Sequence, residues 1–223
     1  MTARREAVAL VLACFVAYGT GLGDVEFYTR GEPREGLVVR EILRTGAWVV
    51  PRRPAGEIAR KPPLYYWLAA PVAAALPSAP ELALRLPSAI VGGAAVLGTW
   101  AATRAAIGPA AALPAALVLL TTFEWTRAAT SARVDMALAG SLVLVLAGWL
   151  VVLSGGHRRW LVLAAAGASL AALAKGPVGL ALPALTVAAY AAWQRDRSVF
   201  HRLGLLPVIG VVWLIAFVAR RRP

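Results

Sequence analysis

Long apolar runs alternate with short polar links along most of this 223-residue chain. Several runs approach the ~17–25 residues that a helix needs to cross the hydrocarbon core of a bilayer. The one long segment of mixed polarity is residues 24–81. We therefore predict an all-α membrane protein, with residues 1–223 forming a single transmembrane domain. We expect about seven spans, at residues 7–23, 84–106, 110–126, 135–153, 160–174, 177–193 and 203–219.

Charge in the links predicts the orientation of the spans. Arg4 and Arg5 precede the first run, and the links around Arg158 and Arg197 are also basic. Because cytoplasmic links carry an excess of lysine and arginine, we predict a cytoplasmic N-terminus. Residues 24–83 then form the first outer loop, on the opposite side of the membrane.

The first outer loop contains segments that suit a membrane surface. Residues 34–44 carry apolar side chains opposite charged ones, which is typical of a short amphipathic helix. A second short helix is predicted from Leu64 to Leu76, with Tyr65, Tyr66 and Trp67 as an interfacial aromatic belt. We expect both helices to lie at the membrane interface.

Composition supports a membrane protein and argues against a nucleic-acid partner. The chain is 60% hydrophobic and 15% charged, whereas soluble domains are about 45–50% apolar and about 25% charged. The formal net charge of +12 lies mainly in the links, so it is not the footprint of a nucleic-acid surface. The single cysteine, Cys14, excludes an internal disulfide.

The chain has two lysines against twenty-one arginines, and both lysines precede proline-containing turns. Lys61 is followed by two prolines, and Lys175 is followed by Gly176 and Pro177. An ammonium group on a flexible stem suits a phosphate that must bind and leave. Snorkelling at the membrane edge is the alternative, although arginine would serve that purpose equally well.

Four charged patches fall on the predicted outer side, at residues 32–35, 60–63, 132–135 and 175–177. Ionisable groups at membrane level are costly and are functional candidates by default. Cations there could hold a phosphate while a carboxylate accepts a proton, which suits group transfer from a phosphate leaving group.

Several of these charges have structural alternatives. Asp135 could cap a helix, and the spacing of Glu124 and Arg127 predicts a structural ion pair. Arg85 and Arg133 are interpreted as anchors at the membrane edge.

At residues 31–34, 40–43, 46–51 and 61–67, the chain resembles the first outer loop of the GT-C glycosyltransferases that use polyprenyl-phosphate sugars. Within that superfamily it is similar to the bacterial lipid A aminoarabinose transferases and the protein O-mannosyltransferases. Residues 132–136 and 173–177 resemble two further motifs of that branch, in the same order. The resemblance covers roughly residues 8–219.

The resemblance implies an inverting enzyme of the bacterial inner membrane with its active face in the periplasm. Its partners would be a polyprenyl-phosphate-linked sugar donor and a lipid or protein acceptor. By position, Arg34 and Lys61 would hold the carrier phosphate, with Lys175 near the same cavity. Glu32 and Asp135 would be the catalytic carboxylates.

The chain also departs from the pattern of the family. Gly31 stands where the family usually carries its presumed base, so the base is expected to be Glu32 or, failing that, Glu35 or Glu26. Arg60 replaces a glutamate of the aminoarabinose transferases, which weakens the expectation of a divalent metal. A divalent metal therefore remains a weakly supported alternative, and no other cofactor is expected.

Length leaves alternatives open. Such enzymes usually continue with more spans and an outer domain, so we expect either a fragment of a longer gene product or a short homologue that needs a partner. A small-molecule or lipid transporter and a catalytically inactive lipid-binding subunit remain the alternative functions.

Overall fold

The structure is a computed structural model that describes residues 2–29 and 31–203. Helices dominate, and the one β-pairing among the described residues is an isolated bridge between Arg52 and Ile58. The predicted all-α class is therefore confirmed. In chain order the helices are α1 (Ala3–Cys14), the π-helix η1 (Phe15–Gly19), α2 (Gly31–Thr45), α3 (Leu64–Ala75), α4 (Pro80–Ala106), α5 (Pro109–Thr121), α6 (Phe123–Ala129), α7 (Val134–Leu153), α8 (Trp160–Lys175), α9 (Pro177–Gln194) and α10 (Ser198–Arg202).

Two of these helices, α4 and α7, are long and apolar enough to cross a membrane, judged by length and composition alone. The predicted spans at 160–174 and 177–193 coincide with α8 and α9. The predicted span at 203–219 lies outside the described residues, apart from Leu203.

The predicted span at 110–126 is wrong as a single helix. α5 ends at Thr121, and Thr122 has an extended backbone with φ −64° and ψ 122° before α6 begins. The Thr122 hydroxyl donates to the carbonyl oxygen of Val118 at 2.7 Å, which provides a local hydrogen bond where the helix ends. The polar pair Glu124 and Arg127 then lies on the separate short helix α6.

Small residues let the helices of the bundle approach one another closely. A Cβ atom added to Gly167 of α8 would lie 2.7 Å from the carbonyl oxygen of Ser141 in α7. A Cβ atom at Gly92 of α4 would lie 2.8 Å from the Cβ of Ala129 in α6. Such close packing at small residues is common in membrane helix bundles.

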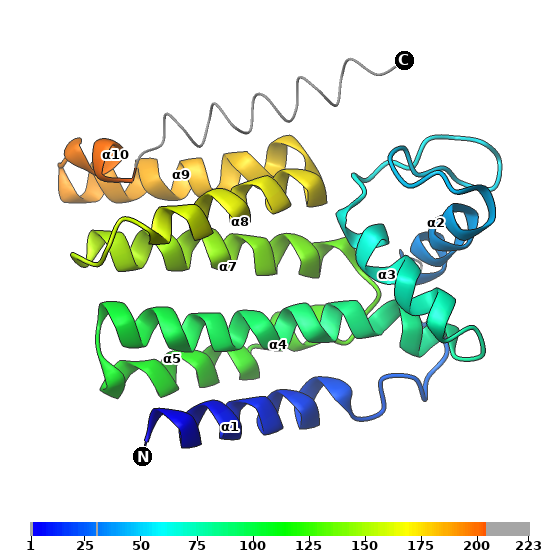
Figure 1. Cartoon of the computed structure of the whole chain (residues 1–223), viewed down its shortest axis with the longest axis horizontal. Helices are drawn as coiled ribbons and strands as arrows, with labels where there is room; N and C mark the ends of the chain where they lie inside the picture. The colour runs from blue at the N-terminus through cyan, green and yellow to red at the C-terminus, as the bar shows by residue number, and fades with distance from the viewer. Residues whose placement is uncertain (1, 30, 204–223) are drawn as a thin grey trace.

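The long helices run side by side, and their connections gather at two ends of the bundle (Figure 1). At one end lie α2, α3, the first residues of α4 and α7, and the junction between α8 and α9. The opposite end carries the N-terminus, the link between α7 and α8, and α10. All four charged patches named in the sequence therefore share one end, as the alternation of spans predicted.

Helix α2 confirms the amphipathic helix predicted at residues 34–44, and it begins three residues earlier, at Gly31. Val38, Val39 and Ile42 are buried against α3, whereas Arg44 on the other face is exposed. The apolar face of this helix thus packs on the protein and helps to form the core beneath the charged patches.

The predicted aromatic belt is wrong for two of its three residues. Tyr65 and Tyr66 are each 1% exposed and belong to this core. The Tyr65 hydroxyl donates to the carbonyl oxygen of Leu84 at 2.7 Å. Since a buried hydroxyl with a partner costs little, tyrosine serves here as a core residue that ties α3 to α4.

Candidate functional site

A buried ion pair organises the charged end of the bundle. Arg85 of α4 is 2% exposed and Glu32 of α2 is 0% exposed, and the Nε atom of Arg85 lies 2.8 Å from Oε1 of Glu32. Arg85 was predicted to be an edge anchor, and that prediction is wrong. Its partner lies 53 residues away in sequence, so no local pattern could indicate it.

Arg85 also holds the link between η1 and α2. Its Nη1 atom donates to the carbonyl oxygens of Leu22 and Val25, and its Nη2 atom donates to that of Glu26, at 2.7–3.1 Å. The guanidinium carbon lies 5.4 Å from the centre of the Tyr28 ring, within cation–π range. One side chain thus fixes the chain that leads into α2.

Both carboxylate oxygens of Glu32 accept hydrogen bonds from the protein. Its Oε1 atom accepts a hydrogen bond from the backbone N–H of Ala132 at 3.0 Å, and Oε2 accepts one from Thr29 at 3.4 Å. Although burial raises the pKa of Glu32, the hydrogen bond from Arg85 and that from Ala132 lower it below its ordinary value. Glu32 is therefore an ionised anchor that joins α2 to α4 and to the turn before α7.

A cationic cavity of about 320 Å³ opens beside this anchor. Three segments build it: the first two turns of α2, the loop before α3, and the start of α3. A second cavity of about 300 Å³ shares Arg34, Arg53 and Arg60 with it. The lining residues of the larger cavity are Gly31, Arg34, Glu35, Val38, Arg53, Arg60, Lys61 and Tyr66.

Glu35 is the carboxylate that faces this cavity. The hydroxyl of Tyr66 donates to its Oε2 atom at 2.6 Å. Burial raises the pKa of Glu35 above its ordinary value, and the negative charge of Asp135 also raises it, against the opposing effects of Tyr66, Lys61 and Arg53. Asp135 and Lys61 thus act electrostatically on Glu35. The raised pKa of Glu35 moves toward neutral pH, where a general base is most effective.

Asp135 and Lys175 form an ion pair across the ends of α7 and α8. Asp135 lies in the first turn of α7, and Lys175 is the last residue of α8. Their side chains are 45% and 28% exposed, and Arg133 is a further cation at 3.8 Å from Asp135. The structure therefore pairs the second lysine of the sequence with the predicted catalytic aspartate.

The candidate residues of the sequence fall into three positions. Arg34 and Lys61 line the cationic cavity, whereas Asp135, which pairs with Lys175, does not line it but acts electrostatically on Glu35. Glu32 is buried in the anchor and does not line the cavity. Glu35, the second choice for the base, does line it.

Two further sequence-based expectations concern an ion pair and a metal site. The ion pair predicted between Glu124 and Arg127 is confirmed, at 2.6 Å. Within residues 2–29 and 31–203, no three acidic, histidine or cysteine side chains gather as metal ligands.

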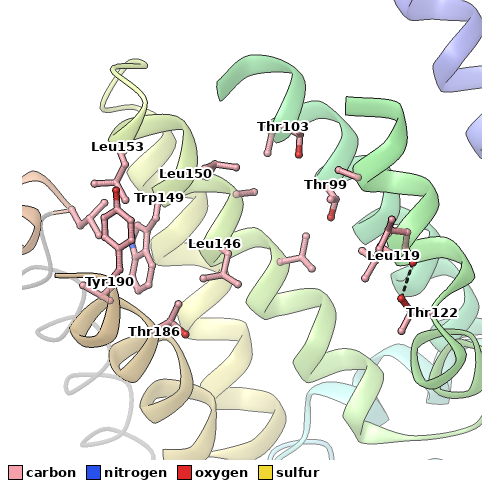
Figure 2. Close-up of a pocket in the computed structure, with 17 residues that line it drawn as sticks. Thr99, Thr103, Leu119, Thr122, Leu146, Trp149, Leu150, Leu153, Thr186 and Tyr190 are labelled. Carbon is pink, nitrogen blue, oxygen red and sulfur yellow. Dashed lines mark hydrogen bonds between the residues drawn. The ribbon is translucent and has the colours of Figure 1, made fainter. Parts of the chain in front are cut away.

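A separate apolar cavity of about 560 Å³ lies between α4, α5, α7 and α9. Figure 2 shows its lining, which combines aliphatic side chains such as Leu146 and Leu150 with Trp149, Tyr190 and several threonines. Among the residues that the structure describes, no charged side chain lines it. This cavity can hold an apolar group, but it offers no cation for a phosphate.

Comparison with known proteins identifies relatives of the whole described bundle. Residues 60–220 match the family described as dolichyl-phosphate-mannose-protein mannosyltransferase. A curated relative, the undecaprenyl phosphate-alpha-4-amino-4-deoxy-L-arabinose arabinosyl transferase of Pseudomonas savastanoi pv. phaseolicola (strain 1448A / Race 6), is 30% identical over 216 residues. That match covers 94% of this chain and 40% of the relative.

Two crystal structures of ArnT from Cupriavidus metallidurans are also similar. The match to the apo structure has a TM-score of 0.80 and 30% identity, and it covers 94% of this chain and 39% of the ArnT chain. The match to the structure bound to undecaprenyl phosphate has a TM-score of 0.85 and 29% identity, and it covers 98% of this chain and 41% of the ArnT chain. The chain thus spans about two fifths of the length of these relatives.

Proposed function

The chain belongs to the dolichyl-phosphate-mannose-protein mannosyltransferase family, and we propose that it forms the carrier-binding part of a membrane glycosyltransferase. The enzyme would move a sugar from a polyprenyl phosphate to a lipid or protein acceptor. The observation that carries this proposal is the cavity in which Arg34 and Lys61 lie beside the carboxylate of Glu35. Support comes from the TM-score of 0.85 to a relative bound to undecaprenyl phosphate.

The proposed topology has seven spans, with the N-terminus in the cytoplasm and the cationic cavity at the periplasmic face of the inner membrane. Residues 24–83 would then be the periplasmic first loop, with α2 and α3 at the interface. The apolar length of α4 and α7 supports this arrangement, as does the gathering of the charged patches at one end of the bundle.

The proposed reaction follows from the charges of the cavity. Arg34 and Lys61 hold the phosphate through charge-assisted hydrogen bonds, which are stronger than neutral ones. Lys175 adds a third cation, and its pairing with Asp135 fixes the position of its ammonium group. These cations stabilise the negative charge that the phosphate gains as it leaves.

Bond formation and proton transfer complete the step. The acceptor hydroxyl attacks the anomeric carbon opposite the phosphate, so the C–O bond to the phosphate breaks with its electron pair and the configuration inverts. Glu35 accepts the hydroxyl proton as the new C–O bond forms. We assign the base to Glu35 rather than to Glu32, because both oxygens of Glu32 are occupied by Arg85, Ala132 and Thr29.

The test is sugar transfer in membranes that contain the gene product of this chain. Lys61→Ala and Glu35→Gln should each abolish transfer while the amount of inserted protein stays unchanged, and Glu32→Asp should instead lower that amount. Undiminished transfer in Lys61→Ala would refute the proposal. Carrier binding without turnover by the wild type would identify an inactive lipid-binding subunit, and substrate flux without a glycoside product would identify a transporter.

A further inference from the structure

We infer that Arg60 determines which sugar the carrier bears, and that this sugar has no positive charge. The donor would be a neutral or acidic sugar rather than an amino sugar. This inference rests on the proposed function, since it specifies the substrate of the same cavity. It separates the chain from its curated relative, whose name specifies a 4-amino sugar.

Arg60 is part of the cationic surface of this site. It lines both cavities, together with Arg34 and Arg53, and it directly precedes Lys61 in the chain. Of the described residues that line the two cavities, Glu35 is the one with a carboxylate. The side chains around a bound carrier are therefore predominantly positive.

Few of these positive charges are neutralised by the protein. Arg53 pairs with Glu57 at 3.6 Å on the exposed side of the loop. Within the described residues, Arg34, Arg60 and Lys61 form no ion pair at 4.0 Å or less. A phosphodiester brings a single negative charge, so it leaves cations unmatched after it binds.

The sugar must lie among these unmatched cations. It is bonded directly to the carrier phosphate, and the two adjoining cavities of about 320 and 300 Å³ share the arginines that surround that position. Like charges repel, and a partly enclosed site screens them less than open solvent does. An ammonium group on the sugar would therefore lose affinity, whereas hydroxyl or carboxylate groups would accept hydrogen bonds from the guanidinium groups.

Glu35 does not remove this repulsion. Its carboxylate already accepts the hydrogen bond from Tyr66, and the charges of Lys61 and Arg53 also act on it. In the proposed reaction it must remain available for the acceptor hydroxyl. We place the discrimination on Arg60 because, of the three arginines that line both cavities, it is the one next to the phosphate-binding Lys61 in the chain. Arg60 is exposed, so it can be replaced without disturbing the core.

The experiment compares two carriers on the purified protein in nanodiscs. Undecaprenyl phosphate esters of arabinose and of 4-amino-4-deoxyarabinose differ only in the charged group, and each displaces labelled undecaprenyl phosphate. We expect the wild type to bind the neutral ester at least tenfold more tightly. Arg60→Glu should reduce that ratio to one or reverse it, and Arg60→Gln should give an intermediate ratio.

The control is Arg158→Glu, which changes the net charge equally. Arg158 is exposed in the link between α7 and α8, and that link lies at the opposite end of the bundle. This variant should keep the wild-type ratio. Equal binding of both esters to the wild type, or an unchanged ratio in Arg60→Glu, would overturn the inference while the proposed function stands. Failure of the wild type to bind undecaprenyl phosphate at all would overturn the proposed function and the inference with it.

Discussion

Replacing Arg85 by methionine should destabilise the protein more than any other single loss of an arginine in the described region. The substitution leaves Glu32 buried at 0% exposure with two backbone N–H partners and no cation. It also removes the donors to three backbone carbonyl groups in the link between η1 and α2. The change therefore acts on the buried charge and on the link at once.

The expected magnitude follows from the burial of the pair. Breaking a buried ion pair by removing one partner costs about 3–5 kcal/mol, because the remaining charge is uncompensated. The carbonyl groups of the link can partly regain water, so we expect about 4 kcal/mol for Arg85→Met. Replacing both residues, as in Arg85→Met with Glu32→Leu, removes the stranded charge. The double variant should be more stable than Arg85→Met alone.

Equilibrium unfolding in mixed micelles with increasing SDS, followed by circular dichroism, measures these differences. The matched control is Arg44→Met, which removes an arginine that pairs with Glu41 while 69% exposed, and solvent screening makes a small effect the expected result. A loss below about 1 kcal/mol for Arg85→Met, or strictly additive effects in the double variant, would refute the reasoning.

Three further predictions concern other contacts. Tyr66→Phe removes the hydrogen bond that lowers the pKa of Glu35, so the acid limb of the kcat/KM profile should move to higher pH; an unmoved limb would argue against Glu35 as the base. Gly167→Val should lower the unfolding free energy by about 1–3 kcal/mol, because the added atoms overlap α7, and unfolding in SDS checks this. Lys175→Met should weaken undecaprenyl phosphate binding about tenfold, as expected for a hydrogen bond to a charged group, whereas Asp135→Asn should have a smaller effect; a titration showing no loss for Lys175→Met would contradict its proposed role.

Periodic and alternating features of this chain were predictable from the sequence. The apolar runs predicted α4, α7, α8 and α9, and the pattern of residues 34–44 predicted most of α2. Because consecutive helices reverse direction, counting spans predicted that the loop before α3 and the junction between α8 and α9 lie at one end of the bundle, as Figure 1 shows.

Long-range pairings were not predictable. Arg85 near the start of an apolar helix has the same local pattern as an edge anchor, and only the fold brings it to Glu32. Tyr65 and Tyr66 likewise match an interfacial belt in sequence, whereas their hydroxyls have partners inside the core and in the cavity wall. The break at Thr122 is a change of backbone conformation at a single residue, which the hydropathy of the run does not indicate.

The central claim is that the cationic cavity binds the phosphate of a polyprenyl carrier, and titration of the purified protein with undecaprenyl phosphate tests it directly. The wild type should bind, and the double variant Arg34→Ala, Lys61→Ala should bind at least tenfold more weakly, a difference of about 1.4 kcal/mol. Arg158→Ala should bind as the wild type does. Equal dissociation constants for the wild type and the double variant would contradict the claim.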